Sequence, residues 1–118
     1  MQIAALAYKV SMRRITTGIA EAHAGLVTPF QHRILTVIEN AMAANDAINT
    51  RLIALKAFNY SPPMGATVAT RQALRSLEWC RIIKRVVQGE GPGQSAWALR
   101  TLFVSESEDG SRRALFVC

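Results

Sequence analysis

The sequence is poor in cysteine, in acidic side chains and in aromatic side chains. Its 118 residues include two cysteines, Cys80 and Cys118, and two histidines, His23 and His32. Two cysteines so far apart do not make a disulfide framework, and neither belongs to a CxxC pair. Together with the histidines they match no recognised spacing of metal ligands. We therefore expect no disulfide framework, no metal and no cofactor.

Long hydrophobic runs are also missing. No apolar stretch approaches the roughly 20 residues that a membrane-spanning helix needs. The N-terminal segment 1–9 superficially resembles a signal sequence, but it has no leading positive charge. Lys9, Arg13 and Arg14 interrupt its apolar part too early for such a signal. We therefore expect a cytoplasmic protein without a membrane partner.

Catalytic motifs are absent from the sequence. Its eight Asp and Glu residues include no pair at a spacing that suggests general acid–base chemistry. The glycine-rich segment 89–93 does not follow the GxGxxG pattern and is expected to join two strands rather than to open a helix. There is no phosphate-binding loop, nucleophile elbow or HExxH zinc motif. The sequence therefore predicts a protein that is not an enzyme and has no catalytic residue.

Basic side chains, in contrast, are abundant. Fourteen Lys and Arg residues against eight acids give a formal net charge of +6. Residues 67–100 carry six basic and two acidic side chains, whereas residues 101–118 carry two basic and three acidic ones. A polyanion is the natural partner of such a basic region. A basic surface that only keeps the protein soluble would explain the same excess.

Capping residues and apolar periodicity predict helices in the first half of the chain. Residues 3–24 are rich in alanine and favour a helix, either continuous or bent or broken at Thr16–Gly18. The segment Thr28–Gln31 has the pattern of a capping box, with proline at the first helical position. The apolar stripe that follows continues in phase, so residues 29–58 form either one helix or two, the second capped at Asn45–Asp46. Asn59 and the prolines after it end this helical part.

A further helix is predicted over residues 67–80, after a loop with two prolines. Thr67 is in a suitable place to cap it. Trp79 and Trp97 are expected as core or interface aromatics, and Cys80 as a small buried residue near the helix end. The inward side of this helix is expected to consist of Thr70, Ala73, Leu74 and Leu77.

The last third of the chain is predicted to form strands. Residues 82–87 are β-branched and short, and residues 96–104 return as a second strand after the glycine-rich tip at 89–93. The Asp-Gly pair within 108–111 favours a tight turn, and residues 114–117 form a third short strand. The predicted order is therefore a series of helices followed by antiparallel strands.

With this order of elements, the segment 70–85 resembles the winged helix-turn-helix family of DNA-binding domains. Many of these domains have a recognition helix that ends in a Leu-x-x-Leu-Glu run, followed by a Gly-Leu-Ile exit into the first wing strand. Leu74, Leu77 and Glu78 match the run, and residues 81–83 stand at the exit. The resemblance identifies the helix over residues 67–80 as the recognition helix.

Two departures accompany this resemblance. The exit glycine of the family is Cys80 or Arg81 here, so the helix has to end without its favoured residue. The loop before the recognition helix is longer than the family's tight turn. The resemblance implies an α+β winged helix-turn-helix fold, with three or four helices followed by a two- or three-stranded antiparallel sheet. It implies a single domain with a helical extension at 1–27, a winged core at 28–104 and a turn and strand at 105–118.

The predicted recognition helix has side chains that suit contact with a DNA groove. Arginine pairs with guanine and glutamine with adenine, and threonine reaches a phosphate or a thymine methyl group. A solvated helix face would explain the same residues. Because Glu90 is the only charged residue of the hairpin tip, we expect the hairpin to contact the DNA backbone rather than to enter the minor groove. The expected DNA-contacting residues are Thr67, Thr70, Arg71, Gln72 and Arg75 in the helix, and Lys84, Arg85 and Arg100 in the hairpin.

These expectations lead to two hypotheses of function. In the first, the protein is a small transcriptional regulator that binds double-stranded DNA in a sequence-specific manner, as a homodimer paired through residues 3–24. In the second, the winged helix contacts another protein, as an assembly subunit or as an inhibitor of a nucleic-acid machine. The N-terminal helix and the apolar segments 102–104 and 115–117 would then form the contact surface. The sequence favours the first hypothesis, because the basic excess, the recognition helix and the hairpin coincide.

Overall fold

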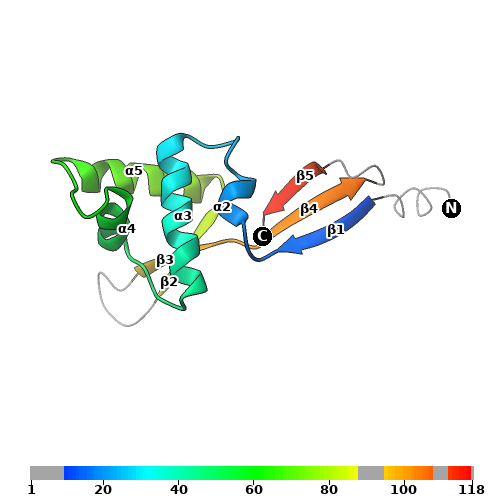
Figure 1. Ribbon diagram of the computed structural model, residues 1–118, viewed down its shortest axis with the longest axis horizontal. Helices are drawn as coiled ribbons and strands as arrows, with labels where there is room; N and C mark the ends of the chain where they lie inside the picture. Colours follow the sequence, from blue (N-terminus) through cyan, green and yellow to red (C-terminus); the bar gives the residue numbers. More distant parts are fainter. Residues whose placement is uncertain (1–9, 88–94, 108–111, 118) are drawn as a thin grey trace. The chain divides into compact units, whose positions relative to one another are not determined.

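The computed structural model describes residues 10–87, 95–107 and 112–117. Within these ranges the chain forms four helices and two antiparallel sheets, so the predicted α+β class is confirmed. Figure 1 shows the elements along the chain. They are β1 (Val10–Ile15), α2 (Ile19–Ala22), α3 (Pro29–Ala43), α4 (Thr50–Ala57), α5 (Ala66–Trp79), β2 (Ile83–Val87), β3 (Ser95–Leu99), β4 (Leu102–Ser107) and β5 (Arg112–Val117).

The chain divides into two compact units. The helical unit, residues 18–100, contains α2 to α5 and the antiparallel hairpin β2–β3. The strand unit comprises the segments on either side of it and contains the sheet β1–β4–β5, with β4 in the middle. The predicted core at 28–104 and its flanking segments at 1–27 and 105–118 stay a prediction. The predicted turn at 108–111 lies outside the described residues.

The helix predicted over residues 3–24 is wrong at Val10–Ile15, which form strand β1 antiparallel to β4. Of the described residues in this segment, helical geometry is adopted after Gly18, whose φ is 72°, and lasts for the four residues of α2. Residues 1–9 lie outside the described part of the chain. A strand takes its hydrogen bonds from another segment, and local alanine content carries no information about that partner. The predicted pairing of two subunits through residues 3–24 stays a prediction, and Val10–Ile15 would take part in it as a strand rather than as a helix.

The single strand predicted over residues 96–104 is also wrong, because two strands occupy this segment. β3 pairs with β2, whereas β4 pairs with β1 and β5, so consecutive strands belong to different sheets. The Arg100 amide donates to the Ile82 carbonyl at 3.0 Å and closes the base of the hairpin. A continuous apolar run in the sequence does not show where one strand ends and the next begins to pair with a different sheet. The strands predicted at 82–87 and 114–117 are confirmed as β2 and β5.

The segment 29–58, for which the sequence allowed one helix or two, contains two helices. α3 begins with the predicted capping box: the Gln31 amide donates to Thr28 Oγ1 at 3.1 Å, and the Thr28 amide donates to Gln31 Oε1 at 3.0 Å. α3 ends where Asn45 adopts a left-handed conformation with φ of 56°. The cap of α4 is Asn49 rather than the predicted Asn45–Asp46, because the chain is still leaving α3 at that pair.

The core of the helical unit forms around α3. Trp97 is 7% exposed, as expected of a core aromatic, and its indole N–H donates to the Thr50 hydroxyl at 3.0 Å. Each large aliphatic side chain buried here stabilises the fold by about 1.5–3 kcal/mol. Fully buried aliphatic side chains of this unit are Ile34, Leu35, Ile38, Ile48, Ile53, Leu74, Leu77 and Ile83. Because these residues come from α3, the segment before α4, α4, α5 and β2, one core positions α5 and the hairpin together.

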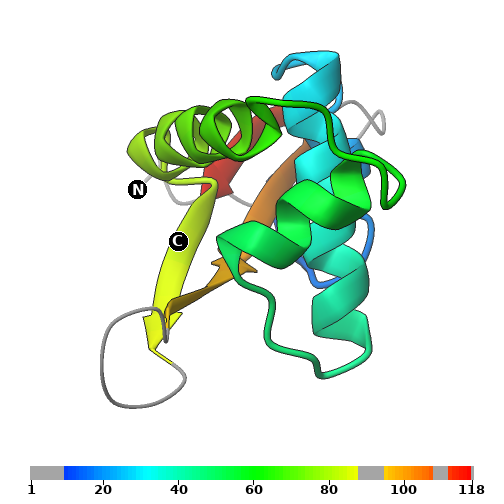
Figure 2. The ribbon, with the colours of Figure 1, turned by 90° about the vertical axis from the view of Figure 1, so that its left-hand side faces the viewer.

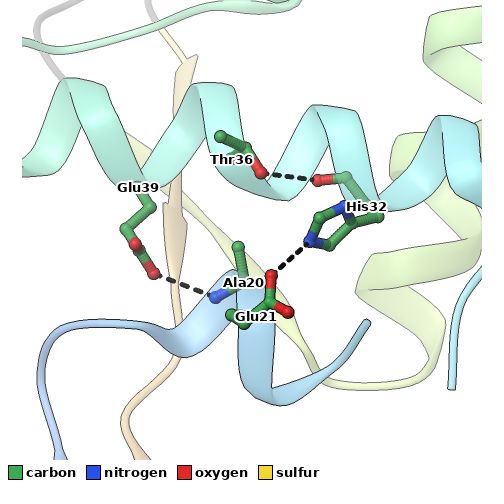
Figure 3. Close-up of polar contacts among 5 residues, drawn as sticks. All are labelled: Ala20, Glu21, His32, Thr36 and Glu39. Atoms are coloured by element: carbon green, nitrogen blue, oxygen red, sulfur yellow. Dashed lines mark hydrogen bonds and ion pairs between the residues drawn. The ribbon is translucent and has the colours of Figure 1, made fainter. Parts of the chain in front are cut away.

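The short helix α2 is held against α3 by polar side chains (Figure 3). The Ala20 amide donates to Glu39 Oε1 at 2.9 Å, and Glu21 Oε2 lies 3.5 Å from His32 Nε2. Gly18 precedes α2 and has no side chain to cap it, so Glu39 satisfies an amide of its first turn. A four-residue helix is not stable by itself. The position of α2 therefore depends on these contacts with α3.

Candidate nucleic-acid interface

Helix α5 turns one side to the core and the other to solvent. It begins after Gly65, which has a φ of 86° and offers no side-chain cap, so Thr67 is not the predicted cap but a residue of the first turn. Side chains three or four positions apart lie on the same side of a helix. The exposed face of α5 consists of Thr67, Val68, Ala69, Arg71, Gln72, Arg75, Ser76 and Trp79.

The prediction that Thr70 contacts DNA is wrong. Its side chain is fully buried, and its Oγ1 has no hydrogen-bond partner among the described residues. Thr70 precedes Leu74 by four positions and Leu77 by seven, which places all three on the inward side of α5. The other helix residues expected to contact DNA are exposed, namely Thr67, Arg71, Gln72 and Arg75.

The end of α5 is a Schellman motif built on Arg81. The Ile82 amide donates to the Leu77 carbonyl at 3.0 Å, and the Arg81 amide donates to the Glu78 carbonyl at 2.9 Å. Arg81 has a φ of 62°, so an arginine adopts the left-handed conformation of the missing glycine. Cys80, expected to be buried, is exposed at the helix cap. The chain turns directly from α5 into β2, as Figure 2 shows, and this turn brings the hairpin to the end of the helix.

The surface at this end of α5 contains an open hollow of about 600 Å³, which we call the arginine hollow. Its four arginines come from α5, from the turn after it, from β2 and from the residue that follows β3. The sequence predicted three of them as DNA-contacting residues and missed the fourth, Arg81. The hollow is lined by Arg75, Glu78, Trp79, Arg81, Arg85 and Arg100.

The lining of the arginine hollow is unbalanced in charge, with one carboxylate for four guanidinium groups. Arg85 Nε donates to Glu78 Oε2 at 3.1 Å. The same guanidinium lies over the Trp97 ring, 5.1 Å from its centroid, in a cation–π contact. Arg100 Nε is buried and has no hydrogen-bond partner in the described part of the chain. The complementary ligand is therefore an anion with several acceptor oxygens.

For Trp79 the sequence left two places open, the core or an interface. Its side chain is 86% exposed and lines the arginine hollow, so the core alternative is wrong and the interface alternative stays a prediction. A signal for this was present, since Trp79 follows Arg71 and Arg75 at spacings of four and falls out of phase with the buried Leu74 and Leu77. For Arg81 the only signal was the missing glycine at the helix exit.

Lys84, the remaining hairpin residue expected to contact DNA, does not line the hollow. It is exposed on β2 beside Arg85, and successive side chains of a strand point to opposite faces. The predicted contact residues Thr67, Arg71 and Gln72 also lie outside the hollow, nearer the start of α5. The predicted hairpin tip at 89–93 is outside the described residues. Of the residues predicted to contact DNA, the structure thus brings Arg75, Arg85 and Arg100 together in the hollow. The other exposed ones lie outside it.

His23 is a buried titratable residue that the sequence left without a role. Its side chain is 3% exposed, and burial lowers its pKa because the charged form loses hydration. Over residues 10–87, 95–107 and 112–117, no three His, Cys, Asp or Glu side chains gather as a metal site would require. Over the same ranges, no helix combines the length and the apolar character needed to cross a membrane.

Comparisons of the chain with protein-family models, with curated proteins and with solved structures found no match. The function is therefore inferred from the exposed face of α5, the hairpin β2–β3 and the arginine hollow.

Proposed function

We propose that this protein binds double-stranded DNA through the exposed face of α5 and the arginine hollow, as a winged helix-turn-helix domain does. The observation that carries the proposal is that the two surfaces are continuous, because Arg75 belongs to both. Cationic groups of the helix and of the hairpin are thereby available to one ligand. DNA matches this arrangement, since its phosphates line a groove at regular spacing.

α5 has the dimensions and side chains of a recognition helix. Its 14 residues make a rod of about 21 Å at a rise of ~1.5 Å per residue. The major groove, about 12 Å wide, admits one such helix. Arg71 and Gln72 lie in the middle of the exposed face, and these residue types form paired hydrogen bonds with guanine and adenine. We assign base contacts to them and a phosphate or methyl contact to Thr67.

The hairpin β2–β3 is proposed as the wing. The order α3, α4, α5, β2, β3 is compatible with a winged-helix layout. Arg85 and Arg100 line the hollow from the hairpin side, and Lys84 adds a charge on the other face. We assign phosphate contacts to these three residues. A protein that reads bases through one helix and holds the backbone through a wing would serve as a small transcriptional regulator.

The proposal is tested by selection from random double-stranded DNA, followed by fluorescence anisotropy on the enriched sequence. Binding is expected to weaken with salt, with a log–log slope of about −0.9 per phosphate contacted. Arg71→Ala combined with Gln72→Ala should lower the preference for the enriched sequence by about 1–3 kcal/mol for each base pair no longer read. Arg51→Ala, which removes an exposed charge of α4, is the matched control. Absence of any enriched sequence, or unchanged preference in the double variant, overturns the proposal.

A second candidate function, a winged-helix module for protein–protein contact, is favoured by one observation. Tyr60 and Val68 are 65% and 53% exposed, and Met64 between them is fully exposed, so apolar side chains gather around the start of α5. Apolar clusters of this kind mark protein contact sites. Here Met64→Ser combined with Val68→Ser should abolish binding of one stoichiometric protein partner, while Arg71→Ala should leave it intact. Salt-sensitive DNA binding that disappears in Arg71→Ala would decide against this alternative.

A further inference from the structure

We propose that the arginine hollow receives an unpaired nucleotide, whose base stacks on Trp79 and whose phosphate lies among Arg75, Arg81 and Arg100. The inference rests on the proposed function, because it takes nucleic acid as the ligand. It adds a distinct preference, for DNA that carries a single-stranded end or a displaced base beside the duplex. Three features of the hollow support it: an exposed indole, a strained arginine and a buried donor without an acceptor.

The first feature is the exposure of Trp79. Tryptophan is usually well buried, yet here its side chain is 86% exposed among arginines. The other tryptophan, Trp97, is buried at 7% exposure and satisfies its indole N–H within the fold. A large aromatic side chain left in water forgoes the favourable free energy of burial. A planar ligand that stacks on the ring would provide that burial. Bases are such ligands, and every base has a face that can stack.

The second feature is the backbone of Arg81. Three helices of the unit end with a left-handed residue: α3 with Asn45, α4 with Asn59 and α5 with Arg81. Asparagine tolerates this conformation, whereas arginine gains nothing from it. Glycine would end α5 with less strain. Strained residues persist where the surrounding structure imposes them, and they cluster at ligand sites. The Arg81 side chain lines the hollow, whereas Tyr60, which is also left-handed with a φ of 63°, does not.

The third feature is the balance of donors and acceptors in the hollow. The carboxylate of Glu78 is already engaged by Arg85, whose guanidinium is in turn stacked on Trp97. Arg100 Nε is buried without an acceptor in the described part of the chain. Buried donors in folded proteins are nearly always satisfied. A phosphate supplies oxygens for Arg100 together with two further arginines, and charge-assisted hydrogen bonds of this kind are strong.

An unpaired nucleotide fits the combination better than duplex DNA alone. Within a duplex each base is covered by its neighbours, so that Trp79 could not reach a base face; an unstacked base exposes that face. The volume of about 600 Å³ lies within the range of roughly 300–1,000 Å³ that small-ligand sites occupy. The phosphate of the same nucleotide would then meet the arginines around the ring.

The test compares four probes: a duplex with a short thymidine overhang, the same duplex with blunt ends, a single-stranded thymidine oligonucleotide, and inorganic phosphate. Both tryptophans emit, but a change of fluorescence on binding reports mainly on Trp79, because Trp97 is buried and out of a ligand's reach. The overhang duplex is expected to quench fluorescence and to bind about tenfold more tightly than the blunt duplex. Trp79→Ala should remove both the quenching and the tenfold preference. Trp79→Phe should keep the preference and lose the quenching, since phenylalanine still stacks.

Each alternative result has a defined meaning. Equal binding of overhang and blunt duplexes, unaffected by Trp79→Ala, overturns the nucleotide site and leaves duplex binding in place. Binding of phosphate with the same affinity as the overhang, again independent of Trp79, also overturns it, because the hollow is then a simple anion site. Quenching by a single-stranded thymidine oligonucleotide without any duplex binding would support the nucleotide site and overturn the proposed function instead.

Discussion

The helical unit gathers polar and charged side chains in two places, and the two places are organised in opposite ways. Between α2 and α3, Glu39 accepts from the Ala20 amide and Glu21 faces His32, so these carboxylates have partners within the chain. The arginine hollow is lined by four guanidinium groups and one carboxylate, that of Glu78, which Arg85 engages. Carboxylates that have a partner within the chain, here a backbone amide and a histidine, hold elements of the fold together. Cationic groups without enough acceptors repel one another when no ligand is bound. They therefore favour a ligand that supplies the missing acceptors.

The largest effect is expected from removing the surplus charge. Arg75→Ala combined with Arg100→Ala should lower the affinity for DNA at least about a hundredfold at low salt, since hydrogen bonds to charged groups contribute about 1.5–3 kcal/mol each. The free energy of unfolding should change little, because the buried Arg100 Nε has no acceptor among the described residues and Arg75 is exposed. Anisotropy titrations and urea denaturation measure the two quantities. If the double variant binds DNA normally but has a much lower free energy of unfolding, the two arginines support the fold rather than DNA binding.

Removing a carboxylate that has a partner in the fold should lower stability and leave DNA affinity unchanged. Glu39→Ala leaves the buried amide of Ala20 without its acceptor and should lower the free energy of unfolding by about 1–2 kcal/mol. DNA affinity should stay the same, because α2 contributes nothing to the exposed face of α5 or the arginine hollow. Glu39→Gln is the control, since its amide oxygen still accepts and most of the stability should return. A loss of binding in Glu39→Ala with unchanged stability would contradict the comparison.

A substitution at Arg81 should change stability and DNA binding in opposite directions. Arg81→Gly relieves the left-handed backbone and should raise the free energy of unfolding by about 1 kcal/mol in urea denaturation. The same change removes a guanidinium from the hollow and should weaken DNA binding about tenfold in anisotropy titrations. Asn59→Gly, at the corresponding position of α4, serves as the control and should leave binding unchanged. An Arg81→Gly protein that is less stable would show that the arginine supports the fold.

The smallest effect concerns pH and His23. Its pKa is lowered in the folded protein by burial, so the unfolded chain binds the proton more readily. Its contribution to stability is therefore present above about pH 6.5 and is lost as the pH falls through the lowered pKa. Urea denaturation at about pH 7.5 and about pH 5, on either side of the ordinary histidine pKa, should show a smaller difference for His23→Gln than for the wild type.

Local chemistry made part of the fold predictable. The capping box at Thr28 and the β-branched run of β2 depend on residues only a few positions apart, so sequence rules sufficed for them. Periodicity also placed Arg71 and Arg75 on the exposed face of α5. The same periodicity turns Thr70 inward toward the core, where a threonine cannot reach DNA.

The candidate site was predictable only in part, for a different reason. Arg75, Arg85 and Arg100 were identified by charge and by their place in a recognition helix or a wing. Arg81 and Trp79 were not, because their importance depends on the conformation of the turn after α5 and on which side of the helix lacks a covering element. Neither property follows from residue type.

By itself, the sequence determined the α+β class, the start of α3, the extent of α5 and the excess of positive charge between residues 67 and 100. Only the tertiary structure decided that Val10–Ile15 is a strand, that the segment 96–104 serves two sheets and that four arginines meet at one hollow. The physical reason is the same in each case. Helix caps and apolar stripes are settled by neighbours along the chain, whereas strand pairing and charge clustering are settled between segments that are distant in sequence.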